Sequence, residues 1–448
     1  MTSLWHHQAQ AVNFLLPLPA GALLMDMGTG KSRCAIELLN RWQTKRTLII
    51  CPKSVIQVWV REFAKHAPDW HPIPLEKGSI LQRKHAADQA LKSLNGHKVA
   101  LIINYESCWR SPIAEWFMTN LPEVVICDEV HRLKQPGGVA SRFIARLGKL
   151  VRRRLGLTGT ICPHSPLDIY GSFRFLKPSL FGYSFVQFRS RYAVMGGYQG
   201  HQVLDYVNLE ELHRKVYSIS YRCEAKDVLD LPEEIDETIT FDLSPKAMKV
   251  YKELEKELIS YVEESGESIS ASTVLVKLLR LAQITGGWIK TDDGQQVRLD
   301  TAKSEALEDL LDGMGQEPVV IFCRFTKDLD TCKEVCDRLK LTWAELSGQA
   351  NDLPRFEEGK AQVLIAQIKS GGVGVDLTRA RYTIFYSLGF SLGDYLQARK
   401  RTHRPGQTRA VTYYHLCAEK TVDEKILKAI AKRAEIVNYL VDALRDCR

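Results

Sequence analysis

The chain has 448 residues, too many for one hydrophobic core, so two or three domains are expected. Hydrophobic residues make up 45% and charged residues 25%, as in ordinary soluble globular proteins. No apolar run approaches the roughly 18 residues of a membrane span, which excludes a transmembrane helix. The net charge of +8 favours a polyanionic partner, with a simple scatter of surface charge as the alternative.

Eleven cysteines are scattered along the chain without a CxxC pair or the spacing of a zinc site. Cys51, Cys127 and Cys323 lie in apolar runs typical of buried strands, which favours reduced, core-filling thiols over a disulfide framework. The N-terminal stretch MTSLWHHQ lacks the pattern of a signal peptide. We therefore expect a soluble, cytoplasmic protein.

Residues Leu4–Leu16 predict an amphipathic helix directly before a glycine-rich segment. The side-chain amide of Gln8 in this helix can both donate to and accept from the edge of an adenine base. Gln8 is therefore a candidate adenine-binding residue, and a solvated glutamine on a helix surface is the alternative.

The segment LMDMGTGKSRCA, residues Leu24–Ala35, has the order of a phosphate-binding loop. Glycines let backbone N–H groups point at an anion, a following helix adds the positive end of its dipole, and a lysine reaches the β- and γ-phosphates. The usual first glycine is replaced by Met25, so an ordinary glycine-rich turn is the alternative. The candidate nucleotide-binding residues are Gly28, Thr29, Gly30, Lys31 and Ser32, with the Ser32 hydroxyl as a magnesium ligand.

After a helical segment at Ser32–Thr44, short apolar runs alternate with helical segments. This alternation predicts a parallel sheet with helices on both faces, and polar residues just past each strand are expected to line the ligand crevice. The predicted strands are Thr47–Cys51, Val99–Ile103, Val124–Cys127 and Arg154–Leu157.

Two carboxylates, Asp128 and Glu129, directly follow the third of these strands in the sequence VVICDEVHRLK. We expect Asp128 to hold magnesium through water and Glu129 to orient and polarise the attacking water in nucleotide hydrolysis. An acidic pair alone usually marks a surface turn. Its position about 100 residues after the phosphate loop favours the catalytic interpretation.

The sequence DEVH resembles the DExH box of superfamily-two helicases. Leu157–Pro178, LTGTICPHSPLDIYGSFRFLKP, resembles the third motif of the Swi/Snf-type DNA translocases. Residues 161–164 depart from the PIQN wording common in that family, so His164 is expected to be a loop or packing residue. The resemblance implies that Thr158, Gly159 and Thr160 couple the nucleotide to the nucleic acid.

The regular alternation lapses between Phe181 and Pro232. Met195–Val203 predicts a glycine-rich hairpin or loop, and Asn208–His213 (NLEELH) opens a helix with Asn208 as its N-cap. Tyr221–Pro232, YRCEAKDVLDLP, resembles the family's segment that braces two lobes. NLEELH and this brace together are most similar to the compact annealing-helicase branch.

Helices at Ser244–Glu264 and Val274–Trp288 precede a second alternating unit. This second unit has no phosphate loop of its own, so we expect it to contribute residues in trans to a nucleotide on the first. Its predicted elements are strands at Val319–Cys323, Ala344–Leu346, Val363–Ala366 and Tyr382–Tyr386 and a helix at Leu392–Ala398.

Residues Gln397–Gln407, QARKRTHRPGQ, resemble the family's sixth motif, QAxxRxxRxGQ, which assigns Gln397 a coupling role. Arg401 and Arg404 are three residues apart, so we expect both on one face of a helix, pointing across a cleft at the γ-phosphate. The planar, permanently charged guanidinium suits the stabilisation of phosphoryl transfer. A solvated or nucleic-acid-facing basic surface is the alternative.

Duplex DNA is bound largely through its phosphates, by basic side chains, hydroxyls and backbone N–H groups. The resemblance places such contacts at strand-end loops, whose candidates are Lys53, Ser54, Tyr105, Ser107, Arg324, Thr326, Ser370, Gly371 and Gly372. Asp376 is expected to turn toward the ribose of the nucleotide, and Arg399 and Lys400 to face solvent or DNA. No base-reading motif is present, which predicts sequence-independent, salt-dependent binding.

The resemblance covers Gln8 to about Lys425 and implies an α/β fold of two tandem RecA-like lobes, 1–235 and 236–448. It further implies a monomer that hydrolyses ATP with Mg²⁺ between the lobes and translocates on double-stranded DNA. The alternatives are a strand-separating DNA or RNA helicase, a slow nucleotide-gated DNA clamp or protein-remodelling switch, and a P-loop kinase or transferase. The lack of the large inserts of nucleosome remodellers suggests a microbial or viral origin.

Overall fold

The computed structural model describes residues 3–159, 165–196, 202–264, 271–290, 295–369 and 375–442. The chain divides into two compact units, Met1–Asp230 with Ile436–Arg448, and Leu231–Glu435. Each unit has its own parallel sheet and its own hydrophobic core. The sequence-based limits, 1–235 and 236–448, keep the C-terminal segment with the second lobe, and they remain a prediction.

The described part of the first unit contains a sheet of seven parallel strands in the order β3-β4-β2-β5-β6-β1-β9. The central strands are buried on both faces, so they are continuous apolar runs and not alternating ones. The strands are β1 (Ala20–Met25), β2 (Arg46–Cys51), β3 (Trp70–Pro74), β4 (Lys98–Asn104), β5 (Val124–Asp128), β6 (Arg153–Thr158) and β9 (Ser220–Cys223).

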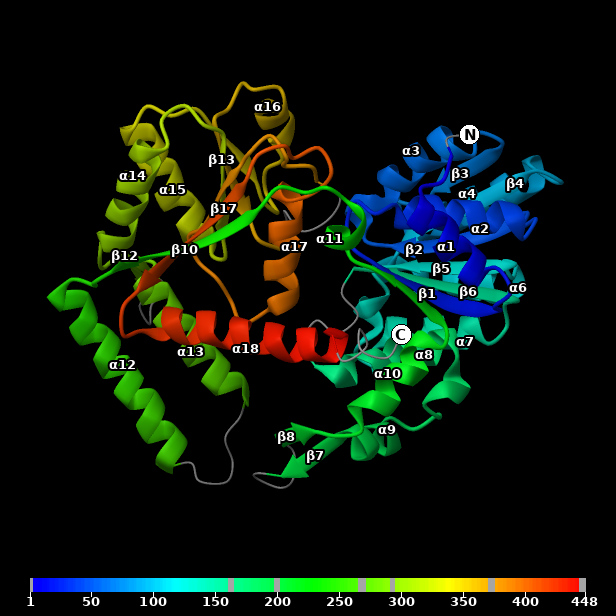
Figure 1. The fold of residues 1–448 in the computed structure, drawn as a ribbon, viewed down its shortest axis with the longest axis horizontal. Helices are drawn as coiled ribbons and strands as arrows, with labels where there is room; N and C mark the ends of the chain where they lie inside the picture. The colour runs from blue at the N-terminus through cyan, green and yellow to red at the C-terminus, as the bar shows by residue number, and fades with distance from the viewer. Residues whose placement is uncertain are drawn as a thin grey trace. The chain divides into compact units, whose positions relative to one another are not determined.

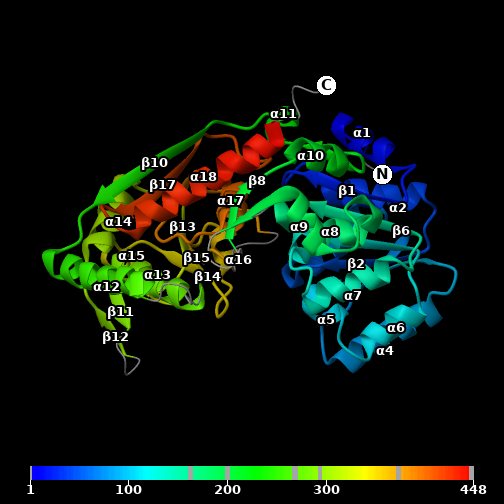
Figure 2. The same ribbon diagram turned by 90° about the horizontal axis from the view of Figure 1, so that it is seen from below.

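Helices cover both faces of this sheet (Figure 2). One face carries α1 (His6–Leu15), α2 (Lys31–Arg41) and α3 (Ile56–His66). The other face carries α4 (Ile80–Ser93), α6 (Ile113–Thr119), α7 (Val139–Gly148) and α8 (Ile169–Leu176), whose apolar side chains share one core with the strands. The remaining elements are α5 (Tyr105–Cys108), α9 (Phe185–Tyr192), α10 (Leu209–Tyr217), α11 (Ala225–Val228), the short 3₁₀ turns η1 (Lys53–Val55), η2 (Val130–Leu133), η3 (Pro166–Asp168) and η4 (Pro178–Leu180), and an antiparallel hairpin of β7 (Ala193–Gly196) and β8 (Gln202–Tyr206).

The second unit, over its described residues, contains six parallel strands in the order β10-β17-β16-β13-β15-β14. The edge strand β10 lies beside β17 along its full length (Figure 1). The strands are β10 (Glu234–Phe241), β13 (Val319–Cys323), β14 (Trp343–Leu346), β15 (Val363–Gln367), β16 (Tyr382–Phe385) and β17 (Val411–Ala418).

Both faces of the second sheet are also covered. α14 (Ala302–Gly313) and α15 (Thr326–Arg338) share an apolar core with one face. α17 (Leu392–Thr402) packs on the other, where the Tyr395 ring lies 5.0 Å from the Phe385 ring between centroids. The remaining elements are α12 (Pro245–Glu264), α13 (Ala271–Thr285), α16 (Leu353–Glu357), α18 (Val422–Asp442) and an antiparallel hairpin of β11 (Trp288–Lys290) and β12 (Gln296–Arg298).

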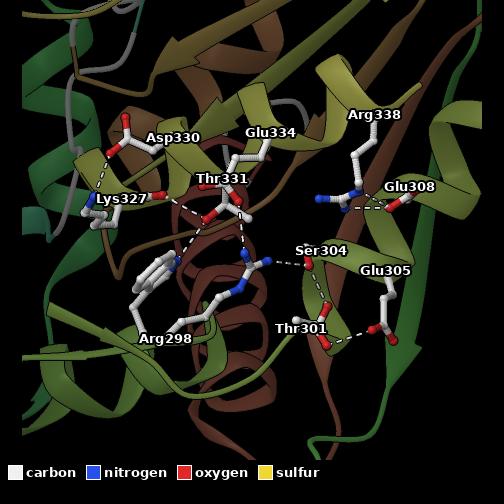
Figure 3. Close-up of polar contacts among 11 residues, drawn as sticks. Arg298, Thr301, Ser304, Glu305, Glu308, Lys327, Asp330, Thr331, Glu334 and Arg338 are labelled. Atoms are coloured by element: carbon white, nitrogen blue, oxygen red, sulfur yellow. Dashed lines mark hydrogen bonds and ion pairs between the residues drawn. The ribbon is translucent and has the colours of Figure 1, made fainter. Parts of the chain in front are cut away.

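Polar contacts fasten the β11–β12 hairpin to α14 and α15 (Figure 3). Arg298 donates to Glu334 at 3.0 Å and to Ser304 at 3.4 Å, and the indole N–H of Trp288 donates to the Thr331 hydroxyl at 2.9 Å. Exposed ion pairs contribute at most about 1 kcal/mol each. Their effect here is to fix the position of the hairpin on the two helices.

The predicted fold class is confirmed, because both main sheets are parallel and covered by helices on both faces. The predicted hairpin at Met195–Val203 is present as β7 and β8, although residues 197–201 lie outside the described part. Asn208 is the N-cap residue of α10 as predicted, but its side chain makes no capping hydrogen bond, and its amide donates to the Arg191 carbonyl at 2.7 Å.

Three further observations concern the described residues only. No helix among them is both long and apolar enough to cross a bilayer. They include no cluster of three or more His, Cys, Asp or Glu side chains placed to hold a metal ion. The nine cysteines in these ranges are free and buried, including Cys51, Cys127 and Cys323, for which the apolar sequence context predicts burial.

Asp328 of α15 is a carboxylic acid buried in the second unit. It accepts hydrogen bonds from the Ser387 hydroxyl and, at 3.3 Å, from the Phe325 N–H. Burial raises the pKa of Asp328 from its ordinary value of 3.8 to about 6, although the Ser387 hydrogen bond opposes the shift. Its ionisation therefore opposes folding.

We expect the stability of the wild type relative to Asp328→Asn to fall as the pH rises from about 4 to about 6, and then to level off. The raised pKa means that the folded state binds this proton more tightly, so its stabilising effect is complete below pH 4 and lost through pH 6. The loss is at most about 3 kcal/mol. Denaturant unfolding at several pH values measures it, with Asp330→Asn on the same helix as control. A stability difference between wild type and Asp328→Asn that does not vary with pH would contradict the raised pKa of Asp328.

Candidate nucleotide-binding and catalytic site

The phosphate loop lies between β1 and α2. β1 ends at Met25 and α2 begins at Lys31, with Gly30 as its N-cap. Gly28 and Gly30 adopt φ values of 81° and 90°, a left-handed region that favours glycine. A Cβ on Gly30 would also collide with the side-chain amide of Gln8. The loop is therefore held open at the helix N-terminus, as an anion-binding loop requires.

The ammonium group of Lys31 is held over the loop. Its Nζ donates to the Met25 carbonyl at 2.9 Å and to the Asp26 carbonyl at 3.1 Å. These carbonyls belong to the last residue of β1 and the first residue of the loop, so the ammonium group lies beside the loop that is proposed to bind phosphate. The Ser32 side chain follows in the first turn of α2 and is partly exposed.

Helix α1 braces this loop from the side. The Gln8 amide donates to the Thr29 carbonyl at 3.1 Å, and a ring nitrogen of His7 lies 2.9 Å from the same oxygen. The side-chain oxygen Oε1 of Gln8 accepts from the Trp5 N–H at 3.1 Å. The Thr29 hydroxyl donates to the Asp26 carbonyl at 2.7 Å. The structure thus assigns Gln8 a loop contact that the sequence did not predict, and adenine binding remains a prediction.

The acidic pair lies at the end of β5, where the register of the sheet places Asp128 beside Leu157 of β6. Asp128 is 8% exposed, and its carboxylate accepts from the Trp59 indole N–H and from the Glu129 N–H, both at 3.0 Å. Burial and the neighbouring Glu129 charge raise the pKa of Asp128 to about 6, while the Lys31 charge lowers it. A desolvated anion of this kind suits a divalent cation, because oxygen ligands are those that Mg²⁺ prefers.

Glu129 is linked to the third motif by polar contacts. Its carboxylate accepts from the Thr158 hydroxyl at 3.3 Å and lies 3.3 Å from Nδ1 of His131. His131 and Thr158 are themselves 2.9 Å apart between Nδ1 and the hydroxyl oxygen. Glu129 has φ 55°, so its backbone is held in an uncommon conformation for a non-glycine residue. The His131 and Trp59 contacts were not predicted.

The third motif runs beside the phosphate loop. β6 pairs with β1 so that Thr158 is opposite Leu24. A Cβ on Gly159 would lie 3.4 Å from the Met25 carbonyl oxygen. Thr158 thus contacts Glu129 and Gly159 lies beside the phosphate loop, and the coupling role of both residues remains a prediction. Thr160 lies outside the described residues, together with residues 161–164.

In the second unit, Arg401 and Arg404 converge on one carbonyl. Each donates from Nη1 to the Val375 oxygen, at 3.4 Å and 3.3 Å. Arg401 is 1% exposed, whereas the Arg404 side chain is 24% exposed and lies 3.9 Å from Asp376. The prediction that one helical face carries both is wrong, because α17 ends at Thr402 and Arg404 follows it.

The residues around the two arginines fix the loop that follows α17. The Gln407 amide donates to the Thr378 and Ala380 carbonyls at 3.1 and 3.0 Å. Asp376 is exposed and accepts from the N–H and the hydroxyl of Thr378, at 3.0 and 2.8 Å. Gln397 is partly exposed on α17. The ribose role of Asp376 and the coupling role of Gln397 remain predictions.

Arg399 differs from its prediction. It was expected to face solvent or DNA, but its side chain is only 15% exposed and pairs with Asp236 at 2.9 Å and Glu234 at 3.4 Å. Its guanidinium carbon lies 4.0 Å from the centroid of the Tyr413 ring. Burial alone would lower the pKa of Arg399, but Tyr395 and the two carboxylates hold it above its ordinary value.

The candidate phosphate contacts fall into two groups. Lys53, Ser54 and Thr326 are exposed, and Arg324 is partly buried, so these four stay candidates. Tyr105 and Ser107 are 4% and 7% exposed and differ from the prediction, because the Tyr105 hydroxyl donates to the Asp128 carbonyl and Ser107 accepts from Arg83, both at 2.8 Å. Ser370, Gly371 and Gly372 lie outside the described residues.

Comparison with known proteins identifies two families along the chain. The SNF2-related domain matches residues 7–286, and the helicase conserved C-terminal domain matches residues 302–406. The Swi/Snf-type resemblance of the sequence is thereby confirmed.

Similar curated proteins come from a phage, a bacterium and a mammal. The chain is 26% identical to putative protein p41 of Acyrthosiphon pisum secondary endosymbiont phage 1, covering 98% of each. It is 24% identical to an uncharacterized ATP-dependent helicase of Mycoplasma genitalium, covering 98% of this chain and 42% of that protein. It is 23% identical to a DNA annealing helicase and endonuclease of Mus musculus, covering 99% of this chain and 41% of that protein. The chain thus spans about two-fifths of the second and third relatives.

Among solved structures, the chain is similar to the Sulfolobus solfataricus SWI2/SNF2 ATPase core in complex with dsDNA. The two share 21% identity over 98% of this chain and 93% of that chain, with a TM-score of 0.45. The matched domains span both parallel-sheet units, and the phosphate loop and acidic pair lie within the first of them. The chain belongs to the SNF2-related family and is an ATP-hydrolysing, helicase-like enzyme.

Proposed function

We propose that this protein uses ATP hydrolysis to translocate along double-stranded DNA without sequence specificity. The observation that carries the proposal is the meeting of Lys31, Asp128, Glu129 and Thr158 at one edge of the first sheet. In this arrangement, the Lys31 ammonium binds phosphates, the Asp128 carboxylate would bind Mg²⁺ and the Glu129 carboxylate orients the attacking water. The proposed general base, Glu129, also contacts the third motif directly, through the Thr158 hydroxyl.

The proposed reaction divides the work between the two units. Lys31 and the loop N–H groups bind the β- and γ-phosphates. Asp128, through water, and Ser32 would hold Mg²⁺, which would neutralise charge on the phosphates. Glu129 takes the proton of the attacking water. Arg401 and Arg404 of the second unit stabilise the charge that develops on the transferred group. Since the second unit has no phosphate loop in its sequence, its arginines act in trans.

Three observations support DNA as the partner. The net charge is +8, the exposed residues Lys53, Ser54 and Thr326 lie at strand ends, and one relative is a DNA annealing helicase. The annealing-helicase branch and a monomeric state remain part of the proposal. The phage and mycoplasma relatives support a microbial or viral origin, and we propose a cytoplasmic location.

Strand separation is the second candidate function. The β7–β8 hairpin carries the exposed apolar side chains Val194 and Leu204, 43% and 63% exposed. Apolar side chains on a hairpin can wedge between base pairs and unstack them. A slow DNA clamp is less favoured, because the sequence retains all the residues expected for ATP hydrolysis, which are Lys31, Asp128, Glu129, Arg401 and Arg404.

We expect Glu129→Gln to lower the kcat of ATP hydrolysis by about 10²- to 10⁴-fold, because the general base is lost. The amide keeps an acceptor toward Thr158, so binding of a non-hydrolysable ATP analogue should change by less than about threefold. Steady-state turnover and equilibrium binding measure the two effects. Glu115→Gln, an exposed position on α6, is the matched control. A Glu129→Gln protein with wild-type kcat would rule out Glu129 as the base.

ATP turnover with duplex DNA, single-stranded DNA and RNA tests the choice of partner. We expect duplex DNA to stimulate turnover most, to displace a bound third strand and to release no strand of the duplex. Stimulation should fall steeply with salt, as for phosphate-dominated binding. Lys31→Ala and Arg404→Ala should each abolish it, whereas Arg409→Ala should not. Stimulation by RNA alone, or release of a duplex strand, would favour a helicase instead.

A further inference from the structure

The segment that leads from β9 into β10, residues 224–233, connects the two sheets. At its start, the Ala225 N–H donates to the Asp26 carboxylate at 3.1 Å, and the Asp26 N–H donates to the Cys223 carbonyl at 2.9 Å. Asp26 also supplies one of the carbonyls that hold the Lys31 ammonium. The beginning of the connecting segment is therefore attached to the phosphate loop.

The end of the connecting segment is attached to His403, which lies between the two arginines in the sequence and directly follows α17. A ring nitrogen of His403 lies 2.7 Å from the Pro232 carbonyl oxygen. Arg399 of α17 reaches Glu234 at 3.4 Å and Asp236 at 2.9 Å, the first and third residues of β10. These contacts lie wholly inside the second unit. They cluster at the start of β10, where the chain enters this unit.

Arg399 is held far more firmly than a surface arginine. Its guanidinium lies over the Tyr413 ring at 4.0 Å and donates to the Tyr395 hydroxyl at 3.0 Å. Its own carbonyl accepts from the Tyr413 hydroxyl at 3.0 Å. Glu234 and Asp236 are 38% and 48% exposed, so the acids are on the open edge and the arginine is inside. The planar guanidinium stacks on a ring and bonds to several partners at once, which the ammonium group of a lysine would not reproduce.

β10 needs this anchor because of its place in the sheet. It is an edge strand, bonded to β17 on one side, and its side chains are mostly exposed. Backbone hydrogen bonds alone would let an exposed edge strand fray. The ion pairs with Arg399 tie its first residues to α17, two residues before Arg401 in the sequence.

We infer that Arg399 is a positioning residue that locks the start of β10, where the connecting segment enters the second unit, to α17, so that a movement of the phosphate loop and a movement of Arg401 and Arg404 are transmitted as one. The inference rests on the proposed function, in which those arginines complete the nucleotide site. Arg399 touches neither nucleotide nor DNA in this scheme. Replacement of Arg399 should therefore change the kcat of ATP hydrolysis and leave ATP binding unchanged.

A double-mutant cycle on ATP turnover tests this inference. The variants are Arg399→Ala, the pair Glu234→Gln with Asp236→Asn, and all three together. We expect Arg399→Ala and the acid pair each to lower kcat about tenfold with the KM for ATP nearly unchanged, and the triple variant to be no worse than Arg399→Ala. Arg399→Lys should recover only part of the activity. Arg409→Ala, which breaks the exposed pair with Glu317, is the matched control.

Hydrogen exchange provides a readout that does not depend on turnover. Arg399→Ala should speed exchange in β10 while leaving β13 at the centre of the same sheet protected. Additive losses of kcat, acid variants with wild-type kcat, or unchanged exchange in β10 would each overturn the inference. A parallel rise in KM would mean direct nucleotide contact and would overturn it too. A wild type without ATP turnover would instead overturn the proposed function, and the exchange experiment would still report on the anchor.

Discussion

The relative register of three parallel strands decides where the chemistry of this protein can occur. β1, β5 and β6 lie side by side, with Leu24 opposite Thr158 and Asp128 opposite Leu157. Their carboxyl ends therefore meet at one edge of the sheet, and three motifs far apart in the sequence become neighbours. A slip of one residue in any of these strands would turn a functional side chain to the other face.

The electrostatics of this edge are those of a site that needs a cation. Asp128 and Glu129 are adjacent, largely buried acids, and desolvation of Asp128, with repulsion by Glu129, raises the pKa of Asp128 to about 6. Lys31 offsets part of this charge. A divalent cation held by Asp128 would supply positive charge beside the two carboxylates.

The sequence predicted the parts of the site that follow from strand ends and missed the parts that depend on distant partners. Lys31, Asp128 and Thr158 follow apolar strands, and the parallel-sheet rule brings them together. Arg399 could not be placed in the same way, because its acidic partners are more than 160 residues earlier in the chain. The end of α17 was legible in principle, since a helix stops near a proline and Pro405 follows shortly after.

The central claim is that a triphosphate held by the first unit is completed by guanidinium groups of the second. Binding of ADP with aluminium fluoride, a mimic of the transferring phosphoryl group, tests it directly when measured beside binding of ADP alone. A transition-state contact predicts that Arg404→Ala weakens the mimic by about 100-fold or more and leaves ADP affinity unchanged. Equal affinity of Arg404→Ala and wild type for the mimic would contradict the claim.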